Sequence, residues 1–310
     1  MQMAHKPPQE VYEQIDFLLL AGLSFNFAVM KIQQKLALGY FKTKLNLLAM
    51  VNKQKAGEEA FKLFCTPFIR YKGPEAAVFR DAEKLSFILN GNKIIGYRCN
   101  YPQPKKVLLL HGFSSTCHRF DKYAEALIKQ GYEVLAFDAP AHGGSDGRTV
   151  NAVEYSDMIR KVVQLYGPVY GFLAHSFGGI AVSLALESLP HNSDTKVVLI
   201  APATETESAI NGAFALLQIN NKILRQGLDE AIFNREGRNT SWYSIRRAMK
   251  NITAKVLWLH DEDDDITPYA DAKKVQEENL SNIEFVFTKG LGHQRIYRDS
   301  AVRKRILEFL

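Results

Sequence analysis

The feature that most constrains this chain is a short apolar segment that ends in a serine. Residues Val169–Gly179 read VYGFLAHSFGG, and Ser176 stands where the apolar run stops. An apolar run followed directly by helix-forming sequence predicts a buried strand that turns sharply into a helix. Such a corner needs small residues two positions before and after the serine, where the chain has Ala174 and Gly178. We therefore expect the Ser176 hydroxyl at the carboxyl end of a sheet, beside a helix N-terminus.

Composition limits the class of protein. With 310 residues, of which 46% are apolar, the chain can form one large globular domain with an appendage. Its three cysteines, Cys65, Cys99 and Cys117, lie far apart and form no CxxC motif. This pattern argues against a disulfide framework and a structural zinc site, and it fits a reducing compartment. The polar start of the chain shows no secretory signal, so we expect a cytoplasmic protein.

Positive charge is concentrated in the N-terminal segment. Residues 1–80 hold 11 Lys and Arg against 6 Asp and Glu, whereas the remainder holds 28 against 27. Lys31–Lys55 contains six lysines and no acidic residue. Such asymmetry favours contact with a membrane or another surface over nucleic acid, for which the chain has no motif. We expect no nucleic-acid partner and a peripheral membrane contact through residues 15–55, and we leave the oligomeric state open.

Two helices are expected in this N-terminal segment. Phe17–Met30 is apolar over 14 residues, shorter than the ~20 residues that a spanning helix needs. A buried helix, a helix in the membrane surface and a membrane span all remain open for it. A second helix is predicted by apolar residues at helical spacing among lysines, a pattern that ordinary surface helices share. These residues are Ile32, Leu36, Tyr40, Phe41, Leu45 and Leu48.

Beyond a predicted hairpin of Leu85–Leu89 and Lys93–Arg98, strands and helices alternate. This alternation predicts a mostly parallel sheet covered on both faces by helices. The predicted strands are Val107–Leu110, Val134–Phe137, Val169–Ala174, Val197–Ala201, Lys255–His260 and Ile283–Phe287. The predicted helices are Asp121–Gln130, Ala152–Tyr166, Gly178–Leu189, Tyr269–Asn279 and Ser300–Leu310.

One stretch, Thr206–Asn251, breaks this alternation because it reads as helices only. We expect helices near Ser208–Ile219, Lys222–Phe233 and Ser241–Met249. An insertion of this length is too long for an ordinary connection, and it predicts a lid over the carboxyl ends of the strands. The expected organisation is therefore an N-terminal helical extension (1–83), a core in two parts (84–205 and 252–310), and a helical cap (206–251).

Residues that could activate Ser176 follow it in a regular order. A serine hydroxyl becomes a good nucleophile when a base removes its proton and a third group orients that base. The predicted strand Lys255–His260 leads into the acidic run Asp261–Asp265. The next strand leads into a glycine-rich loop that ends at His293. A serine, an acid and a histidine thus each follow a separate strand of the predicted sheet.

Over about Lys84 to Leu310, the chain resembles the α/β-hydrolase-fold serine hydrolases. Five motifs carry the resemblance, and they occur in the order of that family. They are His111-Gly112-Phe113, the loop Asp138–Ser145, the corner Ala174–Gly178, Asp264 with Ile266 and Pro268, and Gly292-His293. The resemblance implies an α/β fold with a mostly parallel, doubly wound sheet, a helical cap and an N-terminal helical extension.

The resemblance also implies a catalytic triad. Ser176 would attack an acyl carbonyl and His293 would act as its base. Counted back from Pro268, Asp264 matches the family's position for the acid that orients the histidine, with Asp263 and Asp265 as alternatives.

Two positions depart from the family's pattern. Ala174 replaces a glycine at the serine corner, which is a tolerated change to another small residue. Asp261 replaces a glycine after the strand and begins the acidic run. We expect Asp261, Glu262 and Asp263 to be solvated loop residues.

The resemblance further implies an oxyanion site and no cofactor. The backbone N–H groups of Phe177 and Phe113 would bind the oxyanion, with Gly112 allowing the turn that brings Phe113 close. No metal or cofactor is expected.

The remaining polar residues of the motifs are expected to be structural. His111 and His142 would stabilise loops, His175 would pack beside the serine, and Asp138 would be a loop carboxylate. Cys117 has no visible base partner, so we do not expect a reactive thiol.

The expected function is hydrolysis of a carboxylic ester or related acyl bond in a small-molecule substrate. The alternatives are a ligand-binding protein with little or no hydrolysis, or a carbon–carbon hydrolase or cofactor-free peroxidase of the same fold. Several residues are candidates for lining an apolar acyl site, although core packing would explain them equally well. These are Phe113, Phe177, Phe214, Leu216, Leu217 and Ile219.

Overall fold

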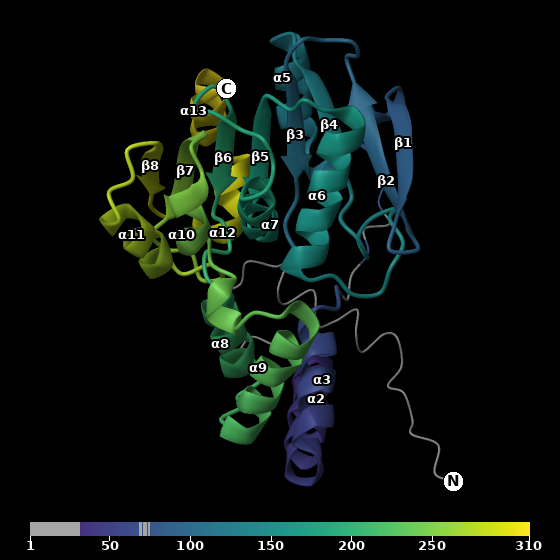
Figure 1. The fold of residues 1–310 in the computed structure, drawn as a ribbon, viewed down its shortest axis with the longest axis vertical. Helices are drawn as coiled ribbons and strands as arrows, with labels where there is room; N and C mark the ends of the chain where they lie inside the picture. The colour runs from purple at the N-terminus through teal and green to yellow at the C-terminus, as the bar shows by residue number, and fades with distance from the viewer. Residues whose placement is uncertain (1–31, 68–69, 71–72, 74) are drawn as a thin grey trace.

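The computed structural model describes residues 32–67, 70, 73 and 75–310. The apolar segment Phe17–Met30 lies outside the described residues, so the three interpretations of it stay open. Eight strands form one sheet in the order β1-β2-β4-β3-β5-β6-β7-β8 (Figure 1). The strands are β1 (Glu83–Leu89), β2 (Asn92–Cys99), β3 (Lys106–Leu110), β4 (Glu133–Phe137), β5 (Gly171–His175), β6 (Lys196–Ile200), β7 (Lys255–Asp261) and β8 (Ile283–Thr288).

The sheet has an antiparallel edge and a parallel remainder. The predicted hairpin is present as β1 and β2, and β2 also pairs antiparallel with β4. From β4 to β8, every neighbouring pair is parallel. The predicted mostly parallel, doubly wound sheet is therefore confirmed. The order of the central strands brings the carboxyl ends of β5 and β7 to the same edge of the sheet.

Two hydrophobic cores, one on each face, explain why the central strands are apolar throughout. Leu109 of β3 packs on one face with Leu127 and Ile306. Its neighbour Leu108 points to the other face, where it packs in the core that contains Met158. Successive strand residues point to opposite faces, so a sheet covered on both sides needs an unbroken apolar run.

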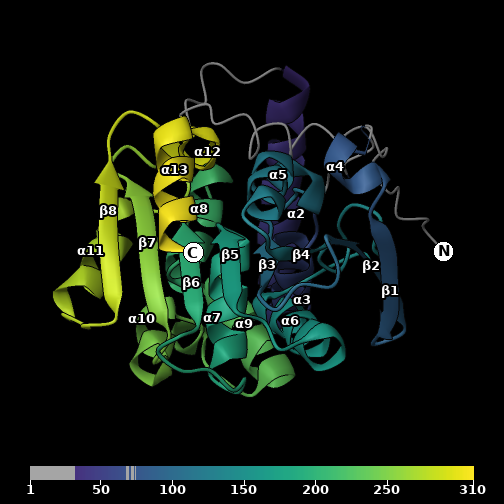
Figure 2. The same ribbon diagram turned by 90° about the horizontal axis from the view of Figure 1, so that it is seen from above.

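Helices cover both faces of the sheet (Figure 2). The helices α5 and α13 cover one face, and α6, α7 and α11 cover the other. The helices next to the sheet are α4 (Ala77–Arg80), α5 (Asp121–Lys129), α6 (Ala152–Tyr166), α7 (Phe177–Leu186), α10 (Ile245–Ala248), α11 (Tyr269–Glu277), α12 (Gly292–Arg295) and α13 (Ser300–Phe309). Short 3-10 helices occur at Cys117–Phe120, Thr240–Trp242, Met249–Asn251 and Ile296–Arg298.

Four further helices project beyond the carboxyl ends of the parallel strands (Figure 1). We call them the helical bundle: α2 (Ile32–Val51), α3 (Lys53–Phe64), α8 (Thr206–Leu216) and α9 (Lys222–Glu236). The bundle thus combines the N-terminal segment with the predicted insertion. The third helix predicted in the insertion, Ser241–Met249, is much shorter in the structure. This range contains only short 3-10 turns and α10, and α10 packs on α7 beside the sheet.

The apolar face predicted for the second N-terminal helix is only partly correct. Phe41 and Leu45 are buried, but Leu36 and Tyr40 are exposed. The physical reason is that α2 carries apolar residues on two opposite sides, and packing against the rest of the bundle covers only one of them. Among the described residues, no helix is both long and apolar enough to cross a membrane.

The bundle depends on one close crossing between α3 and α9. Gly57 and Gly227 meet there, and a Cβ added at Gly57 would lie 2.0 Å from the carbonyl oxygen of Gly227. A Cβ added at Gly227 would lie 2.5 Å from the carbonyl oxygen of Lys53. Both obstacles are backbone atoms, which cannot rotate away as a side chain can. Glycine at both positions is therefore what allows the N-terminal helices to pack on the insertion.

We predict that Gly57→Ala separates α3 from α9 and lowers the free energy of unfolding by roughly 1–3 kcal/mol or more, because the added methyl overlaps backbone. Gly212→Ala on α8 is the matched control, since a Cβ there meets nothing within 4 Å. In the control, the better helix propensity of alanine should stabilise the protein by about 0.5–1 kcal/mol. Denaturant unfolding of both variants tests this. Equal stability of the two would contradict the crossing.

Candidate active site

Ser176 occupies a strained backbone corner between β5 and α7. Its φ of 53° and ψ of −117° lie in a region that residues with side chains rarely adopt. Three backbone hydrogen bonds keep it there: Ser176 N–H donates to the carbonyl of Ile200 at 3.0 Å, and its carbonyl accepts from Gly179 at 2.9 Å and Ala203 at 3.0 Å. Strain of this kind costs about 1–3 kcal/mol and persists only where the surroundings impose it.

Small residues around the corner are required by close packing. A Cβ at Gly178 would lie 2.6 Å from the carbonyl oxygen of Leu110 at the end of β3. A Cβ at Gly112 would lie 3.1 Å from the Cβ of Ser176. The loop after β3 therefore lies directly against the serine. Ala174, the small residue two positions before the serine, is fully buried in β5.

The structure brings Ser176, His293 and Asp264 together in one hydrogen-bonded chain. His293 Nε2 lies 3.0 Å from Ser176 Oγ, and His293 Nδ1 lies 2.9 Å from Asp264 Oδ2. An ionised carboxylate can only accept, so the proton of the neutral imidazole belongs on Nδ1. Nε2 then accepts from the serine hydroxyl. All three residues are buried.

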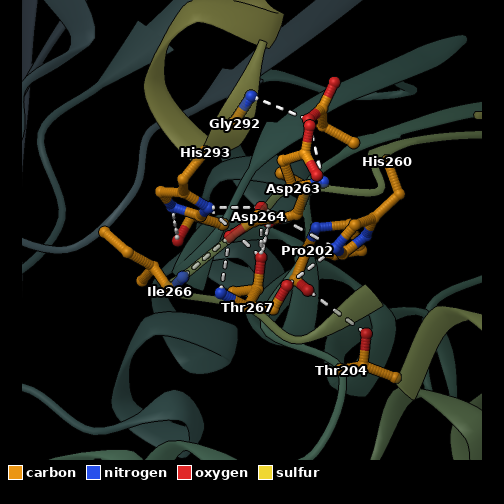
Figure 3. Close-up of polar contacts among 12 residues, drawn as sticks. Pro202, Thr204, His260, Asp263, Asp264, Ile266, Thr267, Gly292 and His293 are labelled. Atoms are coloured by element: carbon orange, nitrogen blue, oxygen red, sulfur yellow. Dashed lines mark hydrogen bonds and ion pairs between the residues drawn. The ribbon is translucent and has the colours of Figure 1, made fainter. Parts of the chain in front are cut away.

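Asp264 accepts four hydrogen bonds, which fix its orientation (Figure 3). Its Oδ1 accepts from the backbone N–H groups of Ile266 at 2.9 Å and Thr267 at 2.8 Å. Its Oδ2 accepts from the Thr267 hydroxyl at 2.8 Å and from His293. Burial alone would raise the pKa of Asp264. The hydrogen bond and charge of His293, the nearby His260 and the Thr267 N–H outweigh burial and lower that pKa below its usual value.

Two residues near Asp264 were missed by the sequence reasoning. Thr267 supplies both a backbone and a hydroxyl donor to the carboxylate. His260, buried at the end of β7, donates from Nε2 to the carbonyl of Thr267 at 2.8 Å and so supports the same turn. Thr267 is adjacent to the proline of the motif and could have been inferred from it. Nothing in the local sequence of His260 distinguishes it from a core residue.

The other carboxylates of the acidic run lie elsewhere. Asp263 and Asp265 are exposed, and the Asp263 side chain accepts from the Gly290 N–H at 3.0 Å. Glu262 is exposed, as expected.

The prediction that Asp261 is solvated is wrong. Asp261 is fully buried, because β7 continues through it and pairs it with Thr288 of β8. Its Oδ1 accepts from Gly292 N–H at 2.9 Å, and its Oδ2 accepts from Leu291 N–H at 3.0 Å and from the Thr288 hydroxyl at 2.7 Å. These hydrogen bonds compensate for the burial of the Asp261 carboxylate, and they hold the loop before His293 in place.

Two loops with structural histidines surround the glycine turn beside Ser176. His111 Nε2 accepts from the Ala139 N–H at 3.0 Å, and His142 Nε2 accepts from the Ser114 N–H at 2.8 Å. Burial is the largest cause that lowers the pKa of both imidazoles, to about 3 for His142. Both rings are therefore neutral acceptors for backbone donors. This geometry is that of loop supports, as the sequence suggested.

Asp138 connects the loop after β3 with the loop after β4 through hydrogen bonds. It accepts from the Thr116 hydroxyl at 2.8 Å and from the backbone N–H groups of Cys117 and Gly144 at 2.9 Å each. Burial, and then the charge of Asp138, raise the pKa of the Cys117 thiol well above its usual value. The thiol is thus kept protonated, which makes it a poor nucleophile.

His175 packs directly against the histidine of the chain. Its ring centroid lies 4.8 Å from that of His293 and 4.5 Å from that of Tyr297, and its Nε2 donates to the carbonyl of His293 at 3.2 Å. Burial and the neighbouring His293 lower the pKa of His175 to about 3. His175 is therefore a neutral packing partner that helps to fix the position of His293.

The predicted oxyanion residues lie together beside the serine. Phe177 is the first residue of α7, so its N–H has no acceptor within the helix. The ring of Phe113 meets that of Phe177 edge to face, with centroids 5.5 Å apart. The structure does not group all the predicted acyl-lining residues with them. Leu216 instead packs on α2, against Ala37, Leu38 and Phe41. Leu217 contacts α2 as well, but it also packs against the core that Phe113 and Phe177 contact.

We predict that Asp261→Asn weakens the loop before His293 and lowers the free energy of unfolding by roughly 2–3 kcal/mol at neutral pH, because charge-assisted hydrogen bonds are lost. Hydrogen bonds lower the pKa of Asp261 despite its burial. The ionised Asp261 therefore stabilises the folded protein fully at pH values above 3.8, the usual pKa of an aspartate. This stabilisation is lost as the pH falls through the lower pKa that Asp261 has in the folded protein.

Unfolding of wild type and Asp261→Asn, compared across this pH range, tests the prediction. The difference between them should shrink as the pH falls below about 3.8. Asp265→Asn is the control, because Asp265 is an exposed residue of the same acidic run. A difference that does not depend on pH would contradict the assignment.

Parts of this chain are similar in sequence to known proteins. The family described as "Serine aminopeptidase, S33" matches residues 102–243. The bifunctional esterase/perhydrolase DCH of Acinetobacter calcoaceticus is 25% identical over 249 residues, covering 64% of this chain and 89% of the relative. Protein YqkD of Bacillus subtilis strain 168 is 25% identical over 248 residues, covering 75% and 81%.

Solved structures share the fold at low sequence identity. The Pyrococcus furiosus esterase Pf2001 matches with a TM-score of 0.61 and 19% identity, covering 79% of this chain and 96% of the esterase. Est1E of Butyrivibrio proteoclasticus, solved with ferulic acid bound, matches with a TM-score of 0.56 and 20% identity, covering 73% and 98%. These comparisons show that the chain has the α/β-hydrolase fold and that it is similar to esterases with that fold.

Proposed function

We propose that the protein is a serine hydrolase that cleaves carboxylic esters or related acyl bonds through an acyl-enzyme intermediate. The observation that carries this proposal is the hydrogen-bonded chain from Ser176 through His293 to Asp264, with distances of 3.0 and 2.9 Å. These are the contacts that a nucleophile, its base and the group orienting that base require. The similarity to esterases supports the same reaction class.

In the first half of the reaction, Ser176 Oγ attacks the acyl carbonyl while its proton moves to His293 Nε2. The carbonyl oxygen becomes an oxyanion, which the backbone N–H groups of Phe177 and Phe113 bind. One such donor contributes roughly 3–4 kcal/mol to the transition state. The tetrahedral intermediate then collapses, the bond to the leaving group breaks, and the leaving group takes the proton from His293.

In the second half, water replaces the leaving group. His293 Nε2 removes a proton from water, which attacks the acyl carbonyl of the ester formed with Ser176. When this intermediate collapses, the acid product leaves and the proton returns to Ser176 Oγ. Asp264 stays ionised throughout, because its lowered pKa disfavours protonation. It holds the imidazole in the required tautomer and stabilises the imidazolium.

The surroundings of Ser176 favour an acyl group with apolar character. The rings of Phe113 and Phe177 contact each other beside the serine, and Tyr155 packs on Phe177 with centroids 5.5 Å apart. We propose that the helical bundle acts as a cap over this region, because it projects from the carboxyl ends of the strands (Figure 1). The substrate class proposed is therefore a small ester with an apolar acyl chain.

We predict that Ser176→Ala abolishes covalent labelling by a fluorophosphonate and lowers kcat/KM for p-nitrophenyl esters by roughly 10⁴-fold or more, because the nucleophile is removed. Ser183→Ala is the matched control, since Ser183 is also buried on α7 but donates its hydroxyl to the Gly179 carbonyl. Gel fluorescence and absorbance assays measure both. Failure of the folded wild type to react with the probe or the esters would refute the proposal.

We predict that Asp264→Asn lowers kcat for the same esters by about 10⁴-fold, as the corresponding change does in a serine protease, because asparagine favours the wrong imidazole tautomer. Asp265→Asn, an exposed neighbour in the same run, should leave kcat nearly unchanged. Steady-state kinetics of the two variants distinguishes them. A larger loss in Asp265→Asn would show that the acid has been assigned to the wrong residue.

A further inference from the structure

The helix α2 has an apolar side that nothing in the described structure covers. Its buried side includes Phe41 and Leu45. The opposite side presents Leu36 (67% exposed), Tyr40 (41%), Leu47 (59%), Met50 (79%) and Val51 (86%). At 3.6 residues per turn, these five side chains fall within an arc of about 100°. We call them the outer stripe.

The concentration of these residues is unusual. Ten large hydrophobic side chains are exposed among the described residues, and the outer stripe contributes five of them from one helix. Single exposed apolar residues are normal on protein surfaces, but several on one side of one helix mark a contact surface. The exposed Thr43 lies within the same arc, so the outer stripe is mainly but not entirely apolar. A helix that only supported the bundle would carry polar residues at these positions.

The charge around the outer stripe is positive. The segment Lys31–Lys55, which contains the whole helix, has six lysines and no acidic residue. Lys44 pairs with Glu59 and Lys53 with Glu230, but these side chains are partly exposed, so the pairs are weak and easily exchanged. An apolar row on a helix rich in lysine is the pattern of helices that lie in the surface of an anionic bilayer.

The position of α2 and the adjoining sequence fit the same surface. The bundle that contains α2 projects beyond the sheet, away from the hydrophobic cores of the sheet (Figure 1). The apolar segment Phe17–Met30 directly precedes this helix in the chain. The sequence therefore carries a second apolar segment immediately before α2.

We propose that the outer stripe of α2 is a docking surface for an anionic lipid bilayer. Leu47, Met50 and their neighbours enter the boundary between headgroups and acyl chains, and the lysines of the segment attract anionic headgroups. This contact is peripheral and independent of the hydrolysis proposed for Ser176.

Co-sedimentation of the full chain with vesicles tests the proposal. Vesicles of phosphatidylcholine with phosphatidylglycerol should bind the protein, and vesicles of phosphatidylcholine alone should bind it at least about tenfold more weakly. Raising the salt from about 0.1 M to about 1 M, which shortens the Debye length from about 10 Å to about 3 Å, should also weaken binding.

Substitutions assign the binding to the outer stripe. Leu47→Glu with Met50→Glu should weaken binding to the anionic vesicles at least about tenfold, and the uncharged pair Leu47→Gln with Met50→Gln should weaken it in the same direction. Ile88→Glu with Leu165→Glu is the matched control, because these exposed residues lie on β1 and α6, outside the bundle. It should bind as wild type does. Thermal midpoints show that each variant is folded.

Three results would overturn the proposal. The first is a wild-type protein that does not bind the anionic vesicles. The second is unchanged binding of both α2 variants, which would assign the contact to another segment such as Phe17–Met30. The third is a dimer, seen by light scattering, that Leu47→Glu with Met50→Glu dissociates while no vesicle binding occurs. That result would make the outer stripe an interface between two copies of this chain.

Discussion

The rest of the structure depends on the close packing at the corner between β5 and α7. Ser176 has a backbone conformation that costs about 1–3 kcal/mol, and hydrogen bonds to two neighbouring segments impose it. The corner also requires Gly178 to lie against the carbonyl of Leu110, and Gly112 to lie against the serine itself. The strained backbone therefore fixes the direction of the Ser176 hydroxyl, and the same contacts bring the loop after β3 next to that hydroxyl.

Two carboxylates from one acidic run support the histidine in different ways. Asp264 bonds the imidazole directly, whereas Asp261 bonds the backbone of the loop that carries His293. Hydrogen bonds outweigh burial in both, so both have a lowered pKa and stay charged at neutral pH. The first fixes how the ring is oriented, and the second fixes where the ring lies.

Sequence reasoning predicted the strands and the order of serine, acid and histidine, because buried parallel strands are continuous apolar runs and functional residues follow them. It failed at Asp261, since burial there comes from the pairing of β7 with β8, which a run of acids does not reveal. It also did not predict that α3 packs on α9. Gly57 and Gly227 lie far apart in the chain, and a glycine within a helix does not identify its partner.

The central claim is that Ser176 forms a covalent ester with the acyl group of its substrate. The most direct test is mass spectrometry of protein quenched with acid during reaction with a short-chain p-nitrophenyl ester. We predict a mass increase equal to one acyl group, located on the peptide that contains Ser176. Rapid turnover without any adduct, or an adduct on another residue, would contradict the proposed mechanism.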